Sequence, residues 1–128
     1  MAGSKPIRAW QCLLYMHDAA NGRGTMAMIT GMVDRLAARL APRTILMYGS
    51  HARNAADANS DVDFLVLFDS LDDRSRVVAD AYDALCRSPL PKDIVVATVE
   101  EFQRYRSVVN TLFYVVSCQG KVVYGAEV

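Results

Sequence analysis

The stretch over residues 45–68 constrains this chain more than any other part of the sequence. An apolar run ends in Gly49 and Ser50, ten mostly small or polar residues follow, and Asp61-Val62-Asp63 then opens a second apolar run. In a strand, alternate side chains share one face. Asp61 and Asp63 are therefore predicted to project together. The other face is predicted to carry the apolar side chains Val62, Phe64, Val66 and Phe68.

Two carboxylates on one face of a strand are energetically unfavourable. They repel each other, and each is costly to remove from water alone. A hard divalent cation held between them removes both costs, because it prefers oxygen ligands. The simpler alternative is an Asp-x-Asp that only begins a strand from a solvated loop. The Gly-Ser pair at this spacing, between apolar strands, favours the functional interpretation.

The Gly-Ser turn has the features of an anion-binding element. Gly49 lets the backbone turn sharply and approach a ligand closely. Ser50 is predicted to cap a short helix that continues through Arg53, and the start of a helix offers free backbone donors to an anion. Arg53 could donate to a phosphate oxygen. We interpret His51 as a residue of the loop surface or a contact near a base.

A third carboxylate begins the next predicted strand, over residues 92–98. Asp93 precedes the apolar run Ile94-Val95-Val96-Ala97. One interpretation is an aspartate bonded to solvent or to a neighbouring turn. The other is a third acidic ligand, brought beside Asp61 and Asp63 when the two strands pair.

The motif Gly49-Ser50, ten residues, then Asp61-Val62-Asp63 resembles the signature of the polymerase-β-like nucleotidyltransferases. The resemblance is closest to their minimal, stand-alone members and covers roughly residues 43–98. Family members usually carry glycine after the arginine that matches Arg53, whereas this chain has Asn54.

The resemblance implies a reaction and a role for each site residue. A nucleoside monophosphate, AMP from ATP by preference, would pass to an acceptor hydroxyl with the help of two Mg²⁺ ions. On the family's pattern, Asp61 and Asp63 would bind both ions, and Asp93 would hold the catalytic ion and help to deprotonate the acceptor. The triphosphate would be seated by Gly49 and Ser50. The expected contact of Arg53 is a phosphate or a partner.

The resemblance also suggests a partner. Minimal members often resemble the antitoxin half of a pair whose other half is a small helical HEPN-type toxin, so a hydroxyl on such a toxin is the expected acceptor. Two alternatives stay open. One is a noncatalytic module that silences its partner by contact, and the other is a transferase for a small molecule of the aminoglycoside type.

Composition bounds the remaining possibilities. The 128 residues fit one domain, over residues 25–128, preceded by an N-terminal arm over residues 1–24. Fourteen basic residues balance fourteen acidic ones, which gives no electrostatic case for tight nucleic-acid binding. Scattered cysteines and the absence of a long apolar run indicate a reducing cytoplasm without membrane association. Association with further copies of the chain is compatible with the sequence.

The predicted fold is an α+β domain, similar to α/β, with a small mixed sheet and helices packed mainly on one face. Helices are predicted over residues 25–40, 71–88 and from 98 to 118 with a break, and strands over residues 44–48, 61–68, 92–98 and 121–124. The second helix should bury an inner stripe that includes Tyr82 and Cys86, and the last should bury Val109. The opposite face of the sheet, with the acidic residues, should stay partly open.

Overall fold

The computed structural model describes residues 25–53, 55–56 and 60–128. The N-terminal arm, Asn54 and most of the loop before Asp61 lie outside the described residues, so the predictions made for them are not addressed. The elements follow in the order α2 (Thr25–Leu40), β1 (Thr44–Tyr48), β2 (Val62–Phe68), α3 (Arg74–Ala84), β3 (Lys92–Thr98), α4 (Val99–Tyr105), α5 (Leu112–Gln119) and β4 (Lys121–Gly125).

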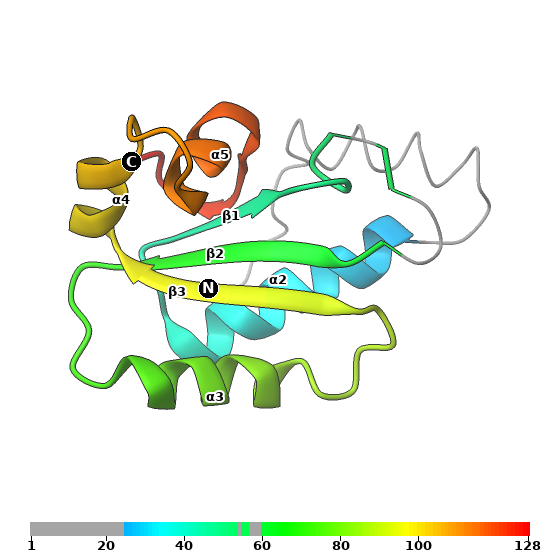
Figure 1. The fold of residues 1–128 in the computed structure, drawn as a ribbon. Coiled ribbons are helices and arrows are strands. Elements are labelled where there is room, and N and C mark those ends of the chain that lie inside the picture. Colours follow the sequence, from blue (N-terminus) through cyan, green and yellow to red (C-terminus); the bar gives the residue numbers. More distant parts are fainter. Residues whose placement is uncertain (1–24, 54, 57–59) are drawn as a thin grey trace.

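Within the described residues the strands form one mixed sheet in the order β3-β2-β1-β4 (Figure 1). β1 pairs antiparallel with both β2 and β4, whereas β2 and β3 pair parallel. A parallel pair needs a crossover, and α3 supplies it. The α+β class and the mixed sheet predicted from the sequence are both confirmed.

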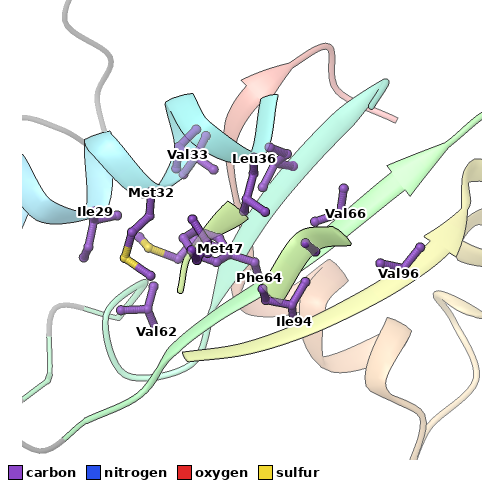
Figure 2. Close-up of a cluster of buried hydrophobic side chains, with 14 of the residues drawn as sticks. Ile29, Met32, Val33, Leu36, Met47, Val62, Phe64, Val66, Ile94 and Val96 are labelled. Carbon is purple, nitrogen blue, oxygen red and sulfur yellow. The ribbon is translucent and has the colours of Figure 1, made fainter. Parts of the chain in front are cut away.

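Each face of the sheet carries its own hydrophobic cluster, because successive residues of a strand point to opposite sides. One face packs against α2 and α3 (Figure 2), through the buried side chains Ile29, Met32, Val33, Leu36, Ile45, Met47, Val62, Phe64, Val66, Ala81, Ile94 and Val96. The other face packs against α4 and α5, through Leu46, Tyr48, Leu65, Leu67, Ala97, Phe102 and Val116.

The helices are thus shared between the two faces. The two longer ones, α2 and α3, lie on one face as expected, and the short α4 and α5 cover part of the second (Figure 1). The reason is the alternation of β2: Leu65 and Leu67 share the face of Asp63 and are fully buried. Those two leucines need an apolar cover, which α4 and α5 provide.

The helix ends follow sequence signals. Asp73 caps α3, where its side chain accepts a hydrogen bond from the Arg76 N–H at 3.1 Å. Thr98 and Glu101 form a capping box at the start of α4: the Thr98 hydroxyl accepts from the Glu101 N–H at 3.1 Å, and the Glu101 carboxylate accepts from the Thr98 N–H at 2.9 Å. Gly120 ends α5.

Three details of the helix predictions are wrong. The second helix is shorter than expected and ends at Ala84, so that Cys86 follows it in a turn and is exposed. Tyr82 is 38% exposed, because its position on α3 faces the edge of the sheet rather than the cluster beneath. Val109 lies before α5 and is 62% exposed.

In the part of the chain that the structure describes, none of the helices combines the length and the apolar character that crossing a membrane would require.

We predict that Glu101→Ala lowers the free energy of unfolding by about 1 kcal/mol, because the variant loses its half of the capping box and an ion pair with Arg74. The hydrogen bond from Arg74, and then that from the Thr98 backbone, hold the pKa of Glu101 below its ordinary 4.5. The stabilisation is therefore complete above pH 4.5 and is lost as the pH falls through the folded-state pKa. Urea denaturation at several pH values measures it.

The matched control is Glu100→Ala in the same helical turn. Among the described residues, Glu100 pairs with Arg104 in an exposed contact at 3.4 Å and four residues away, so its loss should change stability by less than about 0.5 kcal/mol. Equal losses for the two variants would contradict the role assigned to the capping box.

Candidate active site

A row of polar side chains crosses three adjacent strands at one end of the sheet. Tyr48, the last residue of β1, pairs with Asp63 of β2, and Asp63 pairs in turn with Asp93 of β3. Paired residues of neighbouring strands point to the same side, so these side chains share the face that α4 and α5 cover elsewhere. The predicted meeting of Asp63 and Asp93 therefore has its physical basis in the parallel register of β2 and β3.

The carboxylates of this row lie away from α4, which covers the other end of the face. α4 begins at Val99, directly after β3 ends, whereas Asp93 lies at the start of that strand. Asp63 is half-buried, and both Asp93 and Asp61 are exposed. Asp61 precedes the first residue of β2 rather than lying within the strand, so its side chain is less constrained than the alternation of a strand predicted.

The electrostatics of the row reflect uncompensated negative charge. Burial, then the neighbouring charges of Asp93 and Asp61, raise the pKa of Asp63 from 3.8 to about 6. Burial, then the charges of Asp63 and Asp93, also raise the pKa of the Tyr48 hydroxyl well above its ordinary value of 10.0. The surroundings of Asp63 thus disfavour its charged form, which is the condition that a bound cation would relieve.

Gly49 lies directly against the Asp63 carboxyl group. Its φ of +77° is a left-handed conformation that favours glycine, and a Cβ atom at this position would collide with the Asp63 carboxyl oxygen. The sharp turn expected at Gly49 is present, whereas its close approach to a ligand stays a prediction. In this structure the group that approaches is the Asp63 side chain.

The chain after Gly49 forms a turn rather than the predicted short helix. The Arg53 N–H donates to the Gly49 carbonyl at 3.1 Å, and the Ala55 N–H donates to the Ser50 carbonyl at 2.9 Å. These two hydrogen bonds close the turn. Ser50 lies at the start of this turn, beside the glycine that contacts Asp63.

Two side chains of this turn have contacts that the sequence did not indicate. His51 is 4% exposed, with Nε2 3.3 Å from the Ser60 carbonyl oxygen, so its interpretation as a residue of the loop surface is wrong. It joins the turn to the segment that leads into β2. The exposed Arg53 donates to the side-chain oxygen of Gln119 at 3.0 Å, which places the guanidinium at the end of α5.

The donor set of the site suits a hard divalent cation. Asp61, Asp63 and Asp93 offer carboxylate oxygens, which Mg²⁺ prefers, and a bound cation would offset the burial and the neighbouring charges that raise the pKa of Asp63. In the described ranges, no three acidic, histidine or cysteine side chains converge on one point as they stand. The adjacent pair Asp63 and Asp93 is fixed by the sheet, and Asp61 would have to turn toward it.

Two tyrosines of the site were not predicted from the sequence. Tyr48 was read only as the end of an apolar strand, yet it flanks Asp63. Tyr82 was assigned to a buried stripe, yet its hydroxyl donates to an Asp93 carboxyl oxygen at 3.4 Å and accepts from the Ile94 N–H at 3.0 Å. The only available signal was that both are aromatic residues with a polar end, which commonly lie at the border of a core.

Comparison with known proteins assigns the fold to a family. Residues 29–117, well over half of the chain, match the family model described as the nucleotidyltransferase domain. The chain belongs to this family. None of the curated proteins compared with it gives a match.

Solved structures agree with the fold. The toxin-antitoxin MntA-HpeT, in a mutant form, is similar over 74% of this chain and 71% of that one, with 23% identity and a TM-score of 0.53. A protein from Sulfolobus solfataricus, provisionally assigned as a nucleotidyltransferase, is similar over 97% of this chain and 93% of that one, with 17% identity and a TM-score of 0.52.

We predict that Gly49→Ala lowers the free energy of unfolding by about 1–2 kcal/mol, because alanine disfavours the left-handed backbone and its methyl group displaces the Asp63 carboxyl. Denaturant unfolding tests the stability. The control is Gly31→Ala within α2, where a Cβ makes only an ordinary 3.5 Å contact with Arg35, so stability should rise by about 0.5–1 kcal/mol. Similar effects of the two substitutions would contradict the close approach at Gly49.

We predict that Asp63→Asn stabilises the protein at neutral pH in buffer without divalent cations. The raised pKa of Asp63 favours folding below pH 3.8, and this contribution is lost as the pH rises through about 6. Above pH 6 the variant should therefore exceed the unmodified protein by about 1 kcal/mol, after allowance for solvent screening of a half-buried group. Thermal unfolding between pH 4 and 8 measures the difference, and parallel profiles for the two proteins would refute it.

Proposed function

We propose that this protein transfers a nucleoside monophosphate, AMP from ATP, to a hydroxyl group of a partner protein. The observation that carries the proposal is the paired register of Asp63 and Asp93 on an open end of the sheet, with Gly49 against Asp63. Membership of the nucleotidyltransferase domain family supports assigning nucleotidyl transfer to this arrangement.

Each of the three aspartates would have its own role in the reaction. Asp61 and Asp63 would hold two Mg²⁺ ions, with Asp93 on the ion nearest the acceptor, and the bound ions would neutralise charge on the attacking and leaving oxygens. Asp93, exposed at the start of β3, would accept the proton of the incoming hydroxyl. The acceptor oxygen would then form its bond to the α-phosphorus as pyrophosphate leaves.

The turn after β1 would bind the triphosphate. Gly49 and Ser50 present backbone beside the Asp63 carboxyl, where metal-chelated phosphates would lie. Arg53 is exposed, and the exposed side of its guanidinium would contact a phosphate or the partner while Gln119 holds the other side.

A protein acceptor is favoured over a nucleic acid. The chain has fourteen basic and fourteen acidic residues, so no excess of positive charge would attract a polynucleotide. The structurally similar MntA-HpeT is a toxin-antitoxin. We propose by analogy that the partner is a HEPN-type toxin and that the reaction takes place in the cytoplasm, where Cys86 and Cys118 would remain free thiols.

A second candidate is a module that inhibits its partner by contact alone. The observation that favours it is a group of exposed apolar side chains around the junction of α4 and α5, namely Tyr105, Val108, Val109 and Val115. Exposed apolar groups of this kind are common at protein interfaces. These side chains belong to α4, α5 and the segment between them, rather than to the strands that carry Asp63 and Asp93.

We predict that Asp61→Asn and Asp63→Asn each abolish label transfer from α-labelled ATP to a co-expressed partner in the presence of Mg²⁺. Loss of a metal ligand removes several kcal/mol of transition-state stabilisation, which corresponds to a decrease of about a hundredfold or more. Separation of labelled products by electrophoresis, followed by mass spectrometry, measures the transfer and identifies the acceptor.

The control is Asp69→Asn, which removes an exposed carboxylate just beyond the other end of β2 and its ion pair with Arg43. It should transfer label at the unmodified rate. Tight complex formation without label transfer by the unmodified protein, unaffected by Asp61→Asn and Asp63→Asn, would instead support the contact inhibitor.

A further inference from the structure

We infer that Tyr82 is a positioning residue that holds Asp93 in the orientation needed to bind a metal ion and receive a proton. The inference rests on the proposed function, because it assigns a supporting side chain to the same acidic row. Tyr82 lies near the end of α3, on the crossover between the two strands that carry Asp63 and Asp93. Its hydroxyl reaches the outer edge of β3.

The backbone of β3 fixes the position of the hydroxyl. In the described sheet β3 is an edge strand, paired only with β2. The Ile94 N–H donates to the Tyr82 oxygen at 3.0 Å. An edge N–H that would otherwise face solvent thus anchors the tyrosine, which itself extends from a helix packed on the sheet.

The anchored hydroxyl is directed at Asp93. Since the tyrosine oxygen accepts from Ile94, its own proton is available to a second partner, and the Asp93 carboxyl oxygen lies 3.4 Å away. This distance is at the long end of the hydrogen-bond range, so the hydrogen bond is weak and restricts the orientation of the carboxyl group without fixing it. The second carboxyl oxygen remains available for a cation.

Asp93 needs such a guide more than its neighbour does. Asp63 is half-buried and confined by Gly49, whereas Asp93 is exposed at the start of its strand. Two adjacent carboxylates repel each other, and an exposed side chain is free to rotate away from the repulsion. A donor on the far side of Asp93 opposes that rotation and keeps the carboxyl group beside Asp63.

Partners that orient a metal ligand are worth about 10–100-fold in metal affinity or activity. We therefore expect Tyr82→Phe, which removes only the hydroxyl, to weaken Mn²⁺ binding by about tenfold. Isothermal titration calorimetry without nucleotide measures the affinity, well below the melting temperature of each variant. The matched control is Tyr105→Phe, since Tyr105 is 40% exposed on α4, and its Mn²⁺ affinity should be unchanged.

A double-mutant cycle separates a positioning role from a general structural one. If Tyr82 acts through Asp93, Tyr82→Phe should have no further effect on Mn²⁺ affinity in an Asp93→Asn background. It should keep its full effect in an Asp61→Asn background, where Asp93 is intact. In turnover, Tyr82→Phe should lower kcat while the KM for the acceptor is unchanged.

Two results would overturn the inference alone: Mn²⁺ affinity equal to that of the unmodified protein, or a loss of the same size in the Asp93→Asn background. The proposed function can still hold in either case, since label transfer by the unmodified protein would persist. Failure of the unmodified protein to bind Mn²⁺ at all would overturn the proposed function and this inference together.

Discussion

The parallel pairing of β2 with β3 is the constraint on which the site depends. It aligns Asp63 with Asp93 and continues the row to Tyr48 through the antiparallel pairing with β1. A slip of one residue in this register would turn Asp93 to the opposite face and Ile94 toward the acidic row. The buried alternation of Ile94 and Val96 beneath α2 and α3 prevents that slip, because it would place both side chains outside their cluster.

The sheet combines stability and chemistry by dividing its second face. Toward one end, Leu65 and Leu67 are covered by Phe102 of α4 and Val116 of α5. Toward the other end, the same strands present carboxylates, and burial, then the neighbouring charges of Asp93 and Asp61, raises the pKa of Asp63 to about 6. Apolar packing along most of the strand holds the charged end in place despite the repulsion between its carboxylates.

Much of the fold could be predicted from local signals in the sequence. The bounds of β1 and β3, the capping residues Asp73 and Thr98, and the stop at Gly120 follow from propensity and capping chemistry, which act within a few residues. That Asp63 and Asp93 lie side by side could be predicted as well, because each aspartate stands at the start of an apolar strand and the two strands pair.

The remaining features depend on contacts between distant parts of the chain. The burial of His51 and the contact of Arg53 with Gln119 are set by how the turn after β1 packs against its surroundings. The orientation of Tyr82 depends on the place of β3 at the edge of the described sheet, where the Ile94 N–H donates to the tyrosine oxygen. The helical periodicity of α3 gives no information about that edge.

The crossover through α3 also links function to the order of folding. Asp63 and Asp93 are far apart along the chain and meet only after α3 has docked and β3 has paired with β2. A nascent chain that has not yet emerged beyond Asp93 therefore carries only two of the three carboxylates considered for the site, Asp61 and Asp63. Under the proposed function, cation affinity would then arise late in folding, as a property of the completed sheet.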